Sequence, residues 1–284
     1  MVDFEVPEVD YTRYTNRQLA AIPLVVLALA LVVIGGYFAL TGSPVSLGVA
    51  FTGGTELRVA TTDSPAAIEQ AFDGDVDSVT PVGSDNEYLV TFPPGAENIE
   101  TQAQSAGYEV ISVQERAASF GADAQQQALL GVGAAFIGMS VLVFVLFRTF
   151  VPSIAVVASA FSDIVIPLAL MNVFGIDLTL GTVAALLMLI GYSVDSDLLL
   201  NNHILRRRGE FYESTYRAMR TGVTMTLTSI AAMAVMTVVS TLFGIPLLPE
   251  VGLILVFGLS ADLMNTYLLN VSLLRYYKYE GIAA

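Results

Sequence analysis

The chain has 284 residues, of which 55% are hydrophobic and only 13% are charged, and its mean hydropathy is +0.68. This composition excludes a set of globular domains dissolved in water, so the lipid bilayer must be the main solvent. The 26 acids against 12 Lys and Arg argue against nucleic acid as a partner and are typical of a surface adapted to concentrated salt. There is no cysteine, which excludes disulfides and thiolate metal sites, and nothing in the sequence predicts a cofactor or a metal.

The first 18 residues form an acidic leader, which we expect in the cytoplasm, and an apolar stretch follows at 19–40. A helix needs about 20 apolar residues to cross a hydrocarbon core about 30 Å thick, so this stretch can span a membrane. It is too long for the core of a signal peptide, and acids rather than basic residues precede it. We therefore predict a retained anchor.

Residues 41–126 have a different composition, with 13 acids, two arginines and frequent turn residues, and should fold in water. Their periodicity predicts strands near 55–61, 76–82, 88–92 and 108–113. One helix should begin at Pro65 after the cap Ser64, a second should cover 96–106, and a turn at 83–86 should join the two halves. The order βαββαβ predicts a ferredoxin-like α+β domain.

Five further apolar stretches follow within 127–274, at 128–147, 151–174, 178–200, 222–243 and 251–274. The predicted fold is therefore a membrane all-α protein of six transmembrane helices with one inserted α+β domain, ending in a tail at 275–284. Basic residues near span ends stay cytoplasmic. A cytoplasmic N-terminus leaves only Arg58 and Arg116 on the outer side, so we predict an extracytoplasmic domain and two cytoplasmic termini. The basic run at 206–208 serves as an orientation signal and a lipid headgroup contact.

Two motifs carry a family resemblance. After the first span the chain reads Phe51-Thr52-Gly53-Gly54-Thr55, and the fourth span contains Gly191-Tyr192-Ser193. In a one-plus-five arrangement of spans around an external domain, these motifs resemble the SecF family of protein-export membrane proteins, in the resistance-nodulation-division superfamily. The resemblance implies a SecD partner, association with the SecYEG channel, action on a translocating polypeptide, and export driven by the proton gradient.

Gly53 and Gly54 also have a physical interpretation. Adjacent glycines permit positive φ and close backbone approach where the chain turns from the membrane into its first strand. We favour a structural hinge here over a direct contact with translocating polypeptide. A phosphate site is excluded, because no helix start follows the glycines.

Four carboxyl groups lie inside predicted spans, where each costs about 2.5 to 3.5 kcal/mol. Asp163 and Asp262 fall near the middle of the third and sixth spans, and Asp195 and Asp197 lie about 6 to 9 Å nearer the cytoplasm in the fourth. These acids could form a ladder that takes up and releases protons, or they could lock helices together through hydrogen bonds. For the fourth-span pair we favour ion coupling, and for Asp163 and Asp262 both interpretations stay open.

Asp195 and Asp197 lie about 200° apart on a helix, so they cannot point at one partner. Ser193, Asp197 and Asn201 share one stripe, whereas Tyr192, Asp195 and Asn202 share another. In bacterial members of the resembling family the motif continues with Asn-Asp-Thr, which places their acid at Ser196. We favour Asp195 over Asp197 as the coupling acid.

A second departure from the family concerns the cation. Bacterial members carry an arginine near the start of the fifth span, where this chain has Thr221 beside Arg220. Arg220 could extend inward toward the fourth-span acids. Otherwise the fifth span offers only the hydroxyls of Thr221, Thr224 and Thr228, which can hydrogen-bond a carboxyl but cannot neutralise it.

Four functions fit these features. The first is a non-enzymatic export subunit whose membrane carboxylates couple its motion to ion flow. The second is an exporter of a small molecule or lipid, although such exporters usually repeat the one-plus-five unit. The third is an intramembrane aspartyl protease using Asp163 or Asp262 with Asp195, against which stands the lack of a Gly-x-Gly-Asp motif. The fourth is a structural channel partner without ion coupling. Six spans with polar faces predict an obligate membrane partner.

Overall fold

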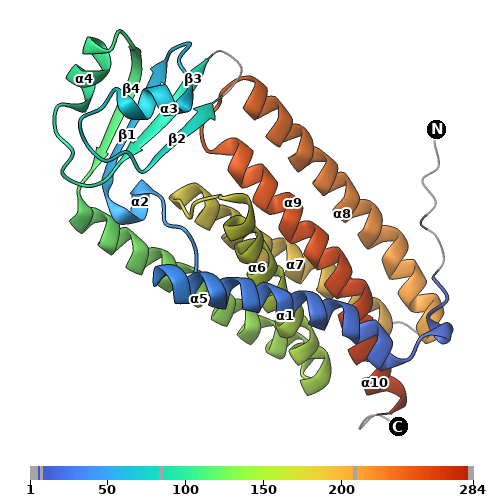
Figure 1. Cartoon of the computed structure of the whole chain (residues 1–284). Helices are drawn as coiled ribbons and strands as arrows, with labels where there is room; N and C mark the ends of the chain where they lie inside the picture. The colour runs from blue at the N-terminus through green and yellow to red at the C-terminus, as the bar shows by residue number, and fades with distance from the viewer. Residues whose placement is uncertain (1–5, 7–8, 83–85, 207–209, 281–284) are drawn as a thin grey trace.

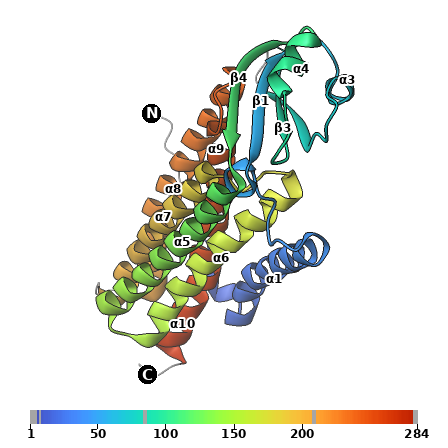
Figure 2. The ribbon, with the colours of Figure 1, turned by 90° about the vertical axis from the view of Figure 1, so that its left-hand side faces the viewer.

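The computed structural model describes residues 6, 9–82, 86–206 and 210–280. Residues 1–5, 7 and 8 of the acidic leader, turn residues 83–85, and Arg207 and Arg208 of the basic run lie outside these residues. Within them, a bundle of long helices carries a small sheet domain at one end, as Figures 1 and 2 show.

Six helices of the described chain are long and apolar enough to cross a membrane, which confirms the predicted number of spans. Their bounds are α1 Asn16–Thr41, α5 Ala118–Phe147, α6 Phe150–Phe174, α7 Leu180–Arg206, α8 Phe211–Leu242, and a continuous run of α9 Leu248–Met264, the π-helix η2 Asn265–Asn270 and α10 Val271–Tyr279. Two helices begin well before the predicted apolar stretches. α5 starts at Ala118 and α8 at Phe211, so both extend past the hydrocarbon-length segment that hydropathy detects.

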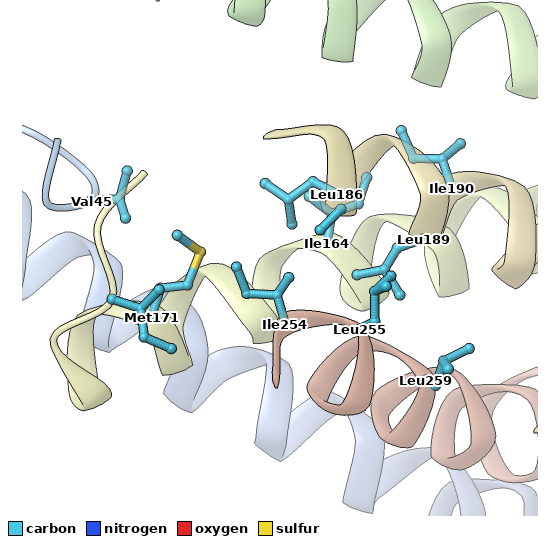
Figure 3. Close-up of a cluster of buried hydrophobic side chains, with 11 residues drawn as sticks. Val45, Ile164, Met171, Leu186, Leu189, Ile190, Ile254, Leu255 and Leu259 are labelled. Atoms are coloured by element: carbon cyan, nitrogen blue, oxygen red, sulfur yellow. The ribbon is translucent and has the colours of Figure 1, made fainter. Parts of the chain in front are cut away.

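Three helices form the centre of the bundle. The largest cluster of buried apolar side chains comes from α6, α7 and α9, with Val45 from the loop after α1 and Ile176 from the loop after α6 (Figure 3). The packing there is tight, since a Cβ added at Gly258 would lie 2.2 Å from Leu189 Cδ1. By contrast, α5, α8 and α1 are little buried. Only 11% of the most apolar 18-residue segment is buried in α5 and in α8, and 17% in α1. Figure 2 shows α1 at the edge of the bundle. The outer helices therefore expose broad apolar faces, as expected in lipid.

The sheet domain follows the order βαββαβ. Its elements are β1 Gly54–Ala60, α3 Pro65–Gln70, β2 Ser78–Val82, β3 Glu87–Phe92, α4 Ile99–Ser105 and β4 Glu109–Arg116. All neighbouring strands are antiparallel, in the spatial order β2-β3-β1-β4. Ile68 of α3 and Ile99 of α4 pack into one core with Leu57 and Val59 of β1, so both helices cover the same face of the sheet.

Local signals explain most of these elements. Ser64 accepts a hydrogen bond from Ala67 N, and Pro65 occupies the first turn of α3, as predicted. Helix α4 begins at Ile99 rather than at 96, because Pro93 and Gly95 hold the preceding chain in a turn and Asn98 adopts a φ of 60°.

A short helix that the sequence did not predict, α2 (Val49–Thr52), precedes the two motif glycines. Gly53 has φ 75° and Gly54 has φ 123°, which is the left-handed region that glycine alone adopts freely. A Cβ on Gly53 would lie 2.6 Å from Ala118 Cα, and one on Gly54 would lie 2.3 Å from Phe92 O. The positive φ and close approach expected of a structural turn are therefore confirmed.

The sheet domain is also attached to the bundle, through contacts at the edge of the domain that faces the helices. Arg58 of β1 pairs with Glu87 of β3 and donates to Gly244 O, in the loop between α8 and α9, at 2.9 Å. The segment after α1 adds two backbone bonds to the loop before α7, Gly48 N to Leu178 O at 2.9 Å and Leu178 N to Ser46 O at 2.7 Å. The sheet domain and the segment that precedes it are thus bound to two loops of the bundle, one between α8 and α9 and the other between α6 and α7.

Glu56 lies in this junction and gives it a pH dependence. Burial raises the pKa of its carboxyl; Arg116 lowers it and Asp177 raises it further. The folded chain therefore holds this proton more tightly than the unfolded chain. Its contribution to stability is complete below the ordinary value of 4.5 and is lost as pH rises through the raised folded value.

Glu56→Gln should accordingly flatten the decline in melting temperature between pH about 4.5 and neutrality. The measurement is thermal unfolding of the purified chain across that range. The exposed Glu69 of α3 provides the control, because Glu69→Gln should leave the slope unchanged. Equal slopes for wild type and Glu56→Gln would contradict the prediction.

Candidate functional site

The predicted intramembrane acids fall into two groups in the structure. Asp163 of α6, Asp197 of α7 and Asp262 of α9 are 1%, 0% and 2% exposed and belong to one hydrogen-bonded network in the centre of the bundle. We call this network, with its hydroxyl and amide partners, the carboxyl cluster. Its further members are Ser193, Ser196, Asn265, Thr266 and Asn270.

One end of the carboxyl cluster is built around Asp163. Ser193 donates to its Oδ2 at 2.5 Å, and the Asn265 amide donates to its Oδ1 at 2.6 Å. These donors come from α7 and η2, so the single carboxyl of α6 joins three helices. The neighbouring Ser196 hydroxyl lies 2.9 Å from the backbone oxygen of Ser193, within donating distance.

The other two acids meet at Thr266. Its hydroxyl lies 2.9 Å from Asp197 Oδ1 and 3.3 Å from Asp262 Oδ1, so it can donate to either carboxylate in turn. Ser196 is 2.7 Å from Asp262 Oδ1, and the Asn270 amide donates to Asp197. The contacts form a continuous series from Asp262 through Thr266 to Asp197 and on to Asn270.

The π-helix η2 supplies three of the hydrogen-bond donors, Asn265, Thr266 and Asn270. Asp262, Thr266 and Asn270 are spaced four residues apart, which places them on one face of the last span. The sixth span widens to π geometry over Asn265–Asn270, and such deformations are frequent at functional sites. The sequence interpretation gave Thr266 no role and considered Ser196 only as the position of the acid in bacterial family members. The four-residue spacing on the last span is the signal that could have found Thr266.

The two predicted stripes of α7 are confirmed. Ser193, Asp197 and Asn201 are buried, whereas Tyr192, Asp195 and Asn202 are exposed. The preference for Asp195 over Asp197 has no support in this geometry, because Asp195 points away from the carboxyl cluster and the inward face carries Asp197. Gly191, also exposed, lies on the outer side.

Arg220 does not reach the acids either. It is exposed and lines a surface pocket with His203, and the hydroxyls of Thr224 and Thr228 donate to backbone oxygens of their own helix. Among the described residues, none of the three cluster acids forms an ion pair with Lys, Arg or His. The expectation that Arg220 extends toward the fourth-span acids was wrong because its position on α8 faces outward.

Several atoms in and beside the carboxyl cluster are buried without a hydrogen-bond partner in the described chain. They are Asp197 Oδ2, both amide atoms of Asn201, Asn265 Oδ1, Asn270 Oδ1, Tyr267 Oη, Ser159 Oγ and Ser162 Oγ. Buried polar atoms almost always pair with protein or ordered water, so this region can bind water or protons. No group of three or more acids or histidines is arranged to hold a metal ion in the part of the chain described.

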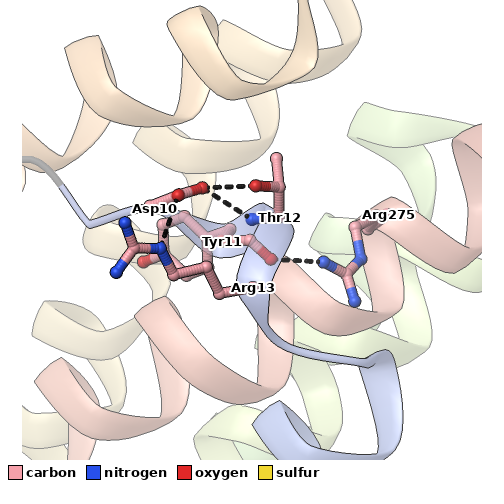
Figure 4. A network of polar contacts seen from close by, with 5 residues as sticks. All are labelled: Asp10, Tyr11, Thr12, Arg13 and Arg275. Carbon is pink, nitrogen blue, oxygen red and sulfur yellow. Dashed lines mark hydrogen bonds and ion pairs between the residues drawn. The ribbon is translucent and has the colours of Figure 1, made fainter.

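The N-terminal segment packs against the end of the bundle that is remote from the sheet domain. Tyr11 Oη donates to Tyr267 O at 3.1 Å, in the same span as Thr266 and Asn270. Arg275 of α10, 9% exposed, donates to Tyr11 O and to Tyr14 O at 2.8 Å each (Figure 4 shows the former). The chain before α1 is thus bound next to the carboxyl cluster.

A helical membrane protein with a sheet domain at one end of its bundle and a carboxyl network at the centre of its spans is the class that this geometry defines. The family described as "Protein export membrane protein SecD/SecF, C-terminal" matches residues 96–280. The protein-export membrane protein SecF of Haloferax volcanii is 67% identical over 285 residues, covering 99% of both chains, and that of Haloquadratum walsbyi is 63% identical over the full length of both. This chain belongs to the SecF family, as its motifs predicted. These relatives come from halophilic archaea, which agrees with the salt-adapted surface expected from the composition.

The fold also matches solved structures. The crystal structure of SecDF, a translocon-associated membrane protein from Thermus thermophilus, superposes with a TM-score of 0.74 at 19% identity, over 96% of this chain and 39% of that one. SecDF in a super-membrane-facing form gives a TM-score of 0.58 at 18% identity. These similarities show the shared fold. This chain spans about two fifths of the SecDF chain, whereas it spans nearly the whole length of its archaeal relatives.

Proposed function

We propose that this chain is a non-enzymatic subunit of the protein-export machinery, which works with SecD and the SecYEG channel to promote polypeptide translocation using the transmembrane ion gradient. Its membership of the SecF family supports the export role. The observation that carries ion coupling is the carboxyl cluster, in which three acids share hydroxyl and amide donors at the centre of the spans. Ionisable groups at this depth are rare and mark ion pathways in membrane proteins.

The contacts suggest how a proton would move. A protonated carboxyl of Asp262 can donate to the Thr266 oxygen while Thr266 donates its own proton to Asp197, so one proton passes between acids 3.3 and 2.9 Å from the shared hydroxyl. Ser196 donates to Asp262 or to the backbone oxygen of Ser193, and the Ser193 hydroxyl donates to Asp163, so Asp163 belongs to the same hydrogen-bonded network as Asp262. The network can therefore gain or lose charge through small changes in hydrogen bonding.

Movement of the external domain would follow from its attachments. Charge changes at η2 alter contacts between α6, α7 and the last span, and the domain is bound to this bundle at Gly244 and through the glycine turn. We propose that proton uptake shifts these helices and that the shift tilts the domain against emerging polypeptide. This assignment places the domain, about residues 41–126, outside the cell and both termini in the cytoplasm.

The SecD partner follows from surface that the chain leaves uncovered. Asp195 and Tyr192 are exposed on α7, and α5 and α8 are little buried on either side of them. A carboxylate facing lipid is costly, so a partner helix that covers this face would stabilise the chain. The solved SecDF chain is long enough to contain a second set of spans in addition to the region matched here.

Reconstitution tests this proposal. Membrane vesicles from cells that lack the chain should recover gradient-dependent export of a secretory protein when the chain is restored with its SecD partner, and the two should copurify in mild detergent. Restored export that is insensitive to collapse of the gradient would favour a structural channel partner. Gradient-driven efflux of a small molecule without any effect on protein export would contradict the proposal.

A further inference from the structure

An open pocket of about 830 Å³ lies between α7 and α8, separate from the carboxyl cluster. Its basic side chains are His203, Arg217 and Arg220, and the remaining lining is Thr221, Thr224, Met225, Thr228 and Ser229. The pocket lies in the half of α8 near Phe211, at the opposite end from Gly244 and the sheet domain. It therefore opens at the end of the bundle that carries the N-terminal segment.

The length of α8 places the basic end of the pocket at headgroup level. This helix has 32 residues, which extend about 48 Å, whereas the hydrocarbon core is about 30 Å thick. Apolar sequence begins only near residue 222, so Arg217 and Arg220 lie on the turns that project past the hydrocarbon. Thr224 and Thr228 continue from them toward the membrane centre.

The pocket holds positive charge in a chain whose net charge is −14. Arg217 pairs with Glu213 one turn away, and both side chains are more than half exposed. Arg220 has no acidic partner among the described residues. Two guanidinium groups and one carboxylate carry a net positive charge, so this site is suited to the oxygens of a phosphate.

The deeper part of the pocket suits an apolar neighbour. Thr224 donates to Arg220 O at 2.8 Å and Thr228 donates to Thr224 O at 2.7 Å, so neither hydroxyl needs an external acceptor. The same face of α8 continues through Val235, 62% exposed, and Leu242, 61% exposed, at seven-residue intervals from Thr228. The surface thus changes from cationic to apolar along one line of the helix.

We propose that this pocket binds an anionic membrane lipid, whose phosphodiester headgroup contacts Arg217 and Arg220 and whose chains lie along α8. Basic pockets between transmembrane helices recognise anionic headgroups through this combination of charge and adjoining apolar surface. The bound lipid would cover the groove between α7 and α8 without entering the carboxyl cluster.

Native mass spectrometry of the full chain, purified with any membrane partner, tests the site with phosphatidylglycerol and phosphatidylcholine as probes. Wild type should retain phosphatidylglycerol preferentially, and Arg217→Gln with Arg220→Gln should reduce that preference about thirtyfold, because each arginine contributes a charge contact. Arg13→Gln with Arg17→Gln is the matched control, since it removes two exposed arginines outside the pocket at the same end. That variant should retain the wild-type preference.

Two further results would overturn the proposal. Displacement of the bound lipid by inorganic phosphate at tenfold molar excess would show a simple anion site. The chain has no cysteine, so Thr224→Cys introduces a single thiol into the pocket. Efficient cross-linking of that thiol to a second protein in native membranes would show that a protein helix occupies the groove, whereas its modification by a lipid-attached maleimide supports the proposal.

Discussion

Asp197→Asn should abolish gradient-dependent export while leaving the chain folded and assembled. The asparagine keeps the size of the side chain and can still accept from Thr266 Oγ1 at the position where the structure shows 2.9 Å, so packing of the last span is preserved. What the amide cannot do is bind and release a proton. We expect the gradient-driven part of the export rate to fall at least about tenfold, equivalent to about 1.4 kcal/mol in the limiting barrier. The measurement is export into membrane vesicles with and without the gradient.

Asp195→Asn is the matched comparison, because it makes the same chemical change two residues away on the same helix. Asp195 is exposed and contacts none of the carboxyl cluster, so gradient-dependent export by this variant should stay close to that of wild type. The opposite pattern, loss with Asp195→Asn and full activity with Asp197→Asn, would move ion coupling to the exposed face of α7 and contradict our assignment.

Gly54→Ala should destabilise the junction between the bundle and the sheet domain by about 2 to 4 kcal/mol. Two effects add: an alanine is strained at a φ of 123°, and its Cβ would lie 2.3 Å from Phe92 O, on the neighbouring strand. Strand β1 would have to move away from β3 or shift its register. Thermal unfolding in detergent and hydrogen exchange of β1 amides measure the effect.

Gly74→Ala controls for the loss of a glycine in the same domain. Gly74 is not held at positive φ, and a Cβ there would meet no atom within 4 Å. Its replacement should leave the melting temperature unchanged or raise it slightly, because alanine reduces the freedom of the unfolded chain. Equal destabilisation by the two substitutions would show that the close approach at Gly54 is not what requires glycine.

Much of the architecture could be predicted because its signals are local. Hydropathy identified six spans, period and capping residues identified the βαββαβ order, and the glycine pair indicated a turn that the structure shows at Gly53 and Gly54. The separation of Asp195 from Asp197 followed from helix geometry alone. Each of these conclusions needs only residues that are close in the sequence.

The composition of the carboxyl cluster needed tertiary information. Which stripe of α7 faces inward depends on α6 and α9 packing on one side while α5 and α8 stay peripheral, and neither arrangement is encoded in the period of α7 itself. Ser196 and Asn265 gain their roles only because their helices meet at Asp163 and Asp262. The π-helix likewise follows no composition rule that the sequence reveals, since its residues read as an ordinary helix.

The bond between the two ends of the chain has a consequence for biogenesis. Arg275 donates to backbone oxygens of residues 264 and 261 positions earlier, so the segment around Tyr11 leaves the ribosome long before its partner is made. The first helix therefore enters the membrane before the contact with Arg275 can form, and the domain and four more helices are made in the meantime. Once the last helix is complete, Arg275 can bind the segment before α1, so this contact forms late in the maturation of the chain.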